Sequence, residues 1–488
     1  MRKQKFITRC LVVATCALLA SCGSESAPAE VTVSATNTVA ALNPTDTPRP
    51  VPPTATTEVA ATATVAAPTT AAPTVAITRP IQTITDVPIF THPTEITNPF
   101  YPVSLIGQSI SLGKEGGEPY RTEVTLLPIT KTVAWNGQQV EVRVSQYVAY
   151  ANGKMVEVAY DLFAQADDGG VYYMGEEVTN YKDGKILNHD GSWQAGKDGA
   201  PPSLIMPAKP QVGQVFNPEN LPGVVYETDE ILSLSEKTTT PNGPIDNALL
   251  IKEILMDNSV EHKVNAANFG IVESRAEDEQ INLVWLDRTD AKRGKIPDPI
   301  LEIEVQAEDI FDAVPGNKWD EIAANAAAVD KIWQAYEKQA TADHVPLPFQ
   351  EALKAAYDRL QKAAAAKDAV ATRQAANDLS AATMDIYTVF GPSVPVDIGR
   401  LDVLERQVVL DASAGDFTAA ADSLAKTATV WERIKPNVLT RNSGPATAEK
   451  FDKVVAAQQE AINAANAAGL NDGAEQGLTL IDTLEGLF

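Results

Sequence analysis

Four turn dipeptides within residues 131–187 constrain the fold more than any other feature of this chain. They recur every 15–16 residues. Asn-Gly and Asp-Gly suit type I′ turns because both central residues need a positive φ, which Gly, Asn and Asp tolerate best. Runs rich in Val and Tyr, which favour strands, lie between them. The spacing predicts an up-and-down antiparallel meander with turns at Asn136-Gly137, Asn152-Gly153, Asp168-Gly169 and Asp183-Gly184.

Two consecutive strands of this meander alternate apolar and polar residues, as a strand with two different faces does. In the first strand Val140, Val142 and Val144 share one face. In the second the apolar face is Val156, Val158, Tyr160 and Leu162, opposite Glu157 and Asp161. Similar runs before and after predict about ten strands in one curled antiparallel sheet, half-barrel or sandwich-like, over residues 96–305.

The pattern changes to helical after Val314-Pro315-Gly316. Alanine becomes frequent, and apolar residues step by three and four from Trp319 to Tyr336, which places them on one helical stripe. Breaks at Lys367-Asp368, Gly415-Asp416 and 469–472 predict an antiparallel α-helical bundle of about five to seven helices, or three αα-hairpins. Asp416 and Asp472 are the expected N-caps. These breaks are 48 and 56 residues apart, too uneven for the roughly 34-residue repeat of a tetratricopeptide solenoid, which is the alternative architecture.

The N-terminus has the pattern of an export signal, with basic residues before a short apolar run. It ends in Leu19-Ala20-Ser21-Cys22, which closely resembles a bacterial lipobox. The resemblance implies that the signal is removed and that Cys22 becomes acylated. Two or three acyl chains give stable anchoring. The expected location is the cell membrane or outer membrane, facing outside the cytoplasm, with the lipid on Cys22 as the contact with the membrane.

Residues 22–95 are rich in Thr, Pro and Ala and contain few aromatic or charged residues. Such a composition cannot bury enough apolar surface to fold. The predicted organisation is therefore a lipoprotein signal peptide at 1–21, a disordered tether at 22–95, an antiparallel β domain at 96–305, a linker at 306–315 and an α-helical bundle domain at 316–488.

Charge and cysteine placement exclude several classes of function. The formal net charge of −25 repels nucleic acid phosphates, so no nucleic acid partner is expected. The three cysteines, Cys10, Cys16 and Cys22, all lie at the N-terminus, so no intrachain disulfide or thiolate metal site is expected beyond them. His344 and Met384 are the single His and Met of the helical domain, which argues against a di-iron or haem site. No cofactor and no metal is predicted.

The run Tyr160–Glu176 is similar to the pattern D-x-x-A-Q-D-x-x-G-x-V-x-Y-x-G-E, with Ala166 in place of the second Asp. Together with residues 191–200, 205–208 and 260–272, it makes the middle region resemble an uncharacterised family of exported bacterial β domains. The resemblance implies an extracytoplasmic β domain and supplies no catalytic residues.

Candidate sites in the β domain are few. Tyr172, Tyr173, Trp193 and Met206 are a candidate ligand pocket, in which aromatic side chains would line an apolar site. The carboxylates Asp167, Asp168, Glu176 and Glu177 lack the alternating spacing of a calcium loop, so we expect turn residues and a solvated strand face.

These patterns predict a non-enzymatic, lipid-anchored extracytoplasmic protein that acts as a binding or scaffold module at the bacterial cell envelope. Its expected partner is an envelope protein or polymer. One alternative is an envelope hydrolase that uses carboxylates such as Glu176 or Asp190, in the β domain or between the domains. Another is a carrier of a lipid or small ligand.

Overall fold

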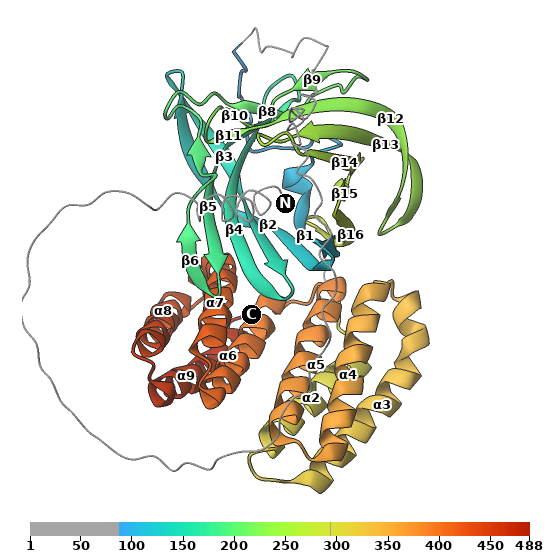
Figure 1. Cartoon of the computed structure of the whole chain (residues 1–488), viewed down its shortest axis with the longest axis vertical. Coiled ribbons are helices and arrows are strands. Elements are labelled where there is room, and N and C mark those ends of the chain that lie inside the picture. Colours follow the sequence, from blue (N-terminus) through green and yellow to red (C-terminus); the bar gives the residue numbers. More distant parts are fainter. Residues whose placement is uncertain (1–86, 293) are drawn as a thin grey trace, which may run out of the picture. The chain divides into compact units, whose positions relative to one another are not determined.

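The computed structural model describes residues 87–292 and 294–488, which form a large antiparallel sheet followed by eight α-helices (Figure 1). This confirms the predicted fold class. The predicted signal peptide, Cys22 and residues 22–86 of the predicted tether lie outside the described residues. Within the described ranges, no helix has the length and apolar character needed to cross a membrane.

The meander forms the first half of the sheet. Strands β1 to β6 pair in sequence order, β1 also pairs with β16, and the order continues backwards from β16 to β12 and then β9. β7 and β8 pair with β5, and β10 and β11 form a separate pair. The strands are β1 (Ile106–Glu115), β2 (Glu118–Trp135), β3 (Gln138–Ala151), β4 (Lys154–Gln165), β5 (Val171–Lys182), β6 (Lys185–Asn188), β7 (Trp193–Gln194), β8 (Ser203–Met206), β9 (Val215–Phe216), β10 (Asn220–Leu221), β11 (Val225–Tyr226), β12 (Thr228–Thr240), β13 (Gly243–Ile254), β14 (Val260–Ala266), β15 (Gly270–Ala276) and β16 (Glu279–Arg288).

Three of the four predicted dipeptides adopt the expected turn. Asn136-Gly137, Asn152-Gly153 and Asp183-Gly184 have a positive φ at both residues, as a type I′ turn requires. At the fourth only Gly169 is positive, and the Ala166 N–H bonds to the Gly170 carbonyl across a wider turn.

The two faces of β3 and β4 are both buried, but against different partners. On one face Val148, Met155 and Val158 pack with Ala425 of helix α7 (Phe417–Leu439). The other face, which includes Glu157 and Ser145, lines the interior of the curled sheet. The sheet thus keeps an interior face that is partly polar.

The helices form two four-helix bundles. Within α2 to α5 each helix packs on two others in a closed cycle, and α6 to α9 repeat this arrangement; α5 contacts α6 between the two bundles. The helices are α2 (Asp298–Ala313), α3 (Trp319–Ala342), α4 (Leu347–Ala366), α5 (Ala369–Phe390), α6 (Val396–Ala414), α7 (Phe417–Leu439), α8 (Gly444–Asn463) and α9 (Ala467–Glu485).

Helix α2 occupies the end of the predicted β domain and most of the predicted linker 306–315. Ile300, Ile303, Ala307 and Ile310 recur at helical spacing and are buried in the first bundle. This apolar stripe makes residues 298–313 part of the helical region, which therefore begins 18 residues before the predicted start at 316, and the last strand ends at 288, 17 residues before the predicted end of the β domain at 305.

A regular hairpin underlies both bundles. Each pair of helices turns through one residue with a positive φ, at Asn317, Lys367, Gly415 and Ala465, which are 50, 48 and 50 residues apart. Asp416 caps α7 as predicted, accepting hydrogen bonds from the Thr418 and Ala419 N–H groups. Asp472 lies inside α9, whose N-cap is Asn466, so that prediction is wrong.

A closed ring of six charged side chains joins the sheet to both bundles. Arginines and carboxylates alternate around it at N–O distances of 2.7–3.4 Å. Around the ring lie Arg121, Asp385, Arg400, Asp397, Arg433 and Glu123, from β2, α5, α6 and α7. Burial alone raises the pKa of Glu123, but the three arginines outweigh it and hold that pKa below its usual range.

Candidate functional site

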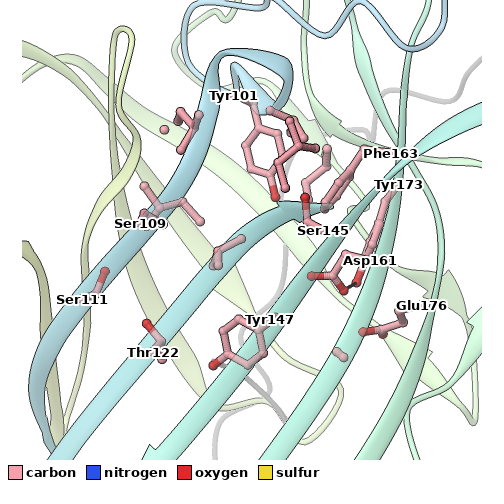
Figure 2. Close-up of a pocket in the computed structure, with 18 of the residues that line it drawn as sticks. Tyr101, Ser109, Ser111, Thr122, Ser145, Tyr147, Asp161, Phe163, Tyr173 and Glu176 are labelled. Atoms are coloured by element: carbon pink, nitrogen blue, oxygen red, sulfur yellow. Dashed lines mark hydrogen bonds between the residues drawn. The ribbon is translucent and has the colours of Figure 1, made fainter. Parts of the chain in front are cut away.

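The interior of the curled sheet contains a cavity of about 220 Å³. Side chains from β1 to β5 form one wall, shown in Figure 2. The segment before β1, β14, the β14–β15 turn, β15, Ile205 of β8 and Glu219 complete the lining. The volume lies below the roughly 300–1,000 Å³ of sites that take drug-sized ligands. This cavity therefore fits a molecule smaller than a typical drug.

The polar part of this wall follows from strand register. Ser145, Asp161 and Glu176 are direct neighbours across β3, β4 and β5, so their side chains share one face. The Tyr173 hydroxyl donates a hydrogen bond to Asp161 Oδ1 at 2.5 Å. Burial raises the pKa of Tyr173 well above its usual value, and Asp161 and Glu176 add to the rise. The hydroxyl therefore remains a donor at neutral pH.

The apolar part of the lining combines aliphatic side chains with three aromatic rings that contact one another. The rings of Phe163 and Tyr173 stack at 4.9 Å between centroids, and Tyr101 meets Phe163 edge-on at 5.4 Å. These contacts hold the rings in fixed positions, which favours a preformed site. An alkyl or cationic group is the natural neighbour for such rings.

The segment before β1 is fastened to the β domain. Gln165 Oε1 accepts hydrogen bonds from the N–H groups of Thr97 and Asn98, each at 2.9 Å, and Asp167 accepts two from Thr91. Asn98 Nδ2 also donates to the carbonyls of Gly169 and Pro207. Residues 87–95, predicted as the end of the tether, thus pack on the sheet, because their polar groups find partners there.

The charges on the cavity lining are mostly negative. Glu157, Asp161, Glu176 and Glu219 line it together with one cation, Lys263. The Lys263 ammonium group forms an ion pair of 2.8 Å with Glu253, which is fully buried. Glu157, Glu176 and Glu219 are buried, and Asp161 is partly exposed.

A second cavity, of about 440 Å³, lies between the sheet and the helices beside the charged ring. Its arginines Arg121, Arg400 and Arg433 are each paired with two carboxylates of the ring. These charges therefore balance one another, and the ring has a structural role. The cavity inside the sheet is the stronger candidate for ligand binding.

The four residues of the predicted pocket are all buried in one apolar cluster. Tyr173 lies on the cavity wall. Trp193 meets Tyr173 edge-on at 5.5 Å, and Tyr172 meets Phe90 edge-on at 5.6 Å. Met206 is paired with Val171 at the start of β5. The lining residues of the cavity include Tyr173 but not Tyr172, Trp193 or Met206.

The carboxylates singled out in the sequence do not form one cluster in the structure. Asp167 and Asp168 hold the wide turn, and Glu177 is exposed beside Lys131. Glu176 is buried on the cavity wall, so the expected solvated face is wrong for this residue. Asp190 lies in the turn after β6 and is exposed, away from the cavity lining. Among the residues that the structure describes, no group of three His, Cys, Asp or Glu side chains is placed to hold a metal ion.

Several lining residues had no signal as site residues in the sequence. Asp161 and Glu157 alternate with apolar residues, a pattern that usually indicates a solvent-exposed face. A clue exists in the same strands, because Tyr147, Ala149, Ala159 and Phe163 share the polar face. A face that mixes carboxylates with aromatic side chains is better explained by an enclosed interior.

Comparison with family models, with curated proteins and with solved structures found no match for this chain.

Proposed function

We propose that this protein is a non-enzymatic, lipid-anchored binding protein of the bacterial envelope, which takes a small organic ligand inside its curled sheet. The observation that carries the proposal is the cavity itself. It is formed by neighbouring strands of one sheet, and its walls combine stacked aromatic rings with buried polar groups. Binding sites for small molecules have this combination of apolar surface and a few placed polar groups.

The placement of the segment before β1 supports the same proposal. Tyr101, Pro102 and Val103 belong both to this segment and to the cavity lining. The segment directly follows the predicted tether. In this proposal the lipid on Cys22 holds the protein at a membrane, and the helical bundles are free to contact an envelope protein or polymer.

A hydrolase remains the second candidate, since Asp161 and Glu176 are cross-strand neighbours on the cavity wall. Many glycoside hydrolases use a pair of carboxyl groups as general acid and as base or nucleophile. Asp190 is not part of this pair. Turnover in a screen of glycoside and ester substrates, abolished by Glu176→Gln, would replace the binding proposal with this one.

Native mass spectrometry of the untagged protein, purified from its own envelope, tests the binding proposal. We expect a small molecule to accompany the wild-type chain. Ser109→Phe places a ring in the cavity and should abolish this added mass. Gln108→Phe, on the opposite face of β1, should retain it. If both variants and the wild type carry no ligand, the proposal fails.

The anchoring proposal has its own test. Cys22→Ser removes the thiol that the lipobox resemblance marks for acylation. We expect this variant to leave the membrane fraction, because one serine hydroxyl gives no comparable anchor. A variant that remains in the membrane fraction would show that something other than the lipid holds the protein there.

A further inference from the structure

We infer that the ligand of the sheet cavity is a small organic ammonium ion, bound with its charged end toward Asp161 and Glu176. This inference rests on the proposed binding function and names the class of ligand. Three observations support it: the charge of the wall, an unused hydrogen-bond acceptor and the aromatic rings.

The summed charge of the wall favours a cation. Four carboxylates and one ammonium group line the cavity, and the ammonium group of Lys263 is paired with Glu253 behind it. The carboxylates have interactions within the protein, so the argument depends on their total charge and not on any unpaired one. A recess with walls of one sign concentrates its field and attracts the opposite charge.

Tyr147 supplies an acceptor on the same wall. Its side chain is labelled in Figure 2, on β3 beside the strand that carries Asp161. Tyr147 is 8% exposed, and no described group donates a hydrogen bond to its buried hydroxyl oxygen. Burial raises the pKa of Tyr147 well above its usual value, and the nearby Tyr120 and Glu157 add to the rise, so the hydroxyl proton stays in place. The free acceptor matches a ligand that donates hydrogen bonds, as an ammonium N–H does.

The aromatic residues complete the site. Phe163, Tyr173 and Tyr101 give a cation or its alkyl substituents apolar and ring-face contacts. An anion at this position would meet four carboxylates. A neutral molecule would gain no charge–charge attraction from the negative wall. An alkyl ammonium ion satisfies both the carboxylates and the rings.

The test uses three probes with one carbon skeleton and different charge: 3,3-dimethylbutylamine, 3,3-dimethylbutan-1-ol and 3,3-dimethylbutanoate. Calorimetric titration of the full-length protein at neutral pH measures each affinity. We expect the amine to bind at least tenfold more tightly than the alcohol, and the carboxylate not to bind. Glu176→Gln should weaken the amine at least tenfold and leave the alcohol unchanged. Glu177→Gln, on the neighbouring exposed position, should change neither.

The outcomes separate this inference from the proposed function. If the alcohol or the carboxylate binds as tightly as the amine, and Ser109→Phe removes that binding, the protein binds ligands in the cavity but the cation assignment is wrong. If none of the probes binds, the cation assignment also fails, while a small molecule found by native mass spectrometry would still support the binding function. An equal loss in Glu176→Gln and Glu177→Gln would show a general charge effect and contradict the placement.

Discussion

Replacement of Glu405 by Gln should stabilise this protein at neutral pH. Glu405 lies on α6 inside the second bundle and is fully buried. Gln458 Nε2 donates to its Oε2 at 2.6 Å, and a side chain at Gly477 of α9 would collide with it. Burial raises the pKa of Glu405 to about 8, against a lowering effect of the Gln458 hydrogen bond. The folded protein therefore holds a proton that the unfolded chain releases.

The sign and size follow from this difference. The unfolded carboxyl has a pKa of 4.5. Between 4.5 and about 8 the folded state binds more protons, so the free energy of unfolding falls as pH rises. At 1.36 kcal/mol per pKa unit, the penalty is about 1 kcal/mol at pH 5 and about 3 kcal/mol at pH 7. Gln has nearly the shape of the protonated acid and does not titrate.

Urea titrations followed by circular dichroism at pH 5 and pH 7 measure the effect. We expect Glu405→Gln to exceed the wild type in unfolding free energy by about 2 kcal/mol more at pH 7 than at pH 5. Glu460→Gln, on the exposed face of α8, is the matched control and should show no such pH dependence. If the Glu405→Gln difference is the same at both pH values, Glu405 is ionised in the folded protein and the reasoning is wrong.

Two further predictions test the fold. Asp397→Asn breaks the charged ring and leaves Arg433 buried without its bidentate partner, so we expect the unfolding free energy measured by urea titration to fall by about 3–5 kcal/mol. Glu449→Gln, in an exposed ion pair, is the control and should change it by less than about 0.5 kcal/mol. Equal effects would contradict the structural role of the ring. Asn466→Ala should cost about 1 kcal/mol through loss of the α9 N-cap, and Asp472→Ala less than about 0.5 kcal/mol; the reverse order would support the helix start expected from sequence.

Local chemistry explains what the sequence could predict. Asn136-Gly137, Asn152-Gly153 and Asp183-Gly184 favour a positive φ whatever the rest of the chain does. The meander can therefore be predicted from these local residues alone. The heptad-like spacing from Trp319 to Tyr336 similarly determines a buried helical face. The same spacing exists from Ile300 to Ile310, but it spans a short segment rich in acidic residues. For this reason the sequence pattern did not predict helix α2.

Long-range packing explains what the sequence could not predict. The apolar face of β4 is covered by α7, about 270 residues later, so its polar face became the interior of the sheet. Only this arrangement makes Asp161, Glu176 and Tyr147 parts of one cavity. The fourth helical hairpin of the regular series turns at Ala465, where neither Gly nor Asn marks the left-handed residue. The break predicted at 469–472 therefore lies several residues after the actual turn.

The most direct test of the account is an experimental structure of the protein crystallised with 3,3-dimethylbutylamine. We predict ligand density inside the curled sheet, with the nitrogen within hydrogen-bond distance of the carboxylates of Asp161 or Glu176, and the alkyl group against Phe163. A cavity that contains only water at saturating amine, or amine bound only at the outer surface, would contradict the account.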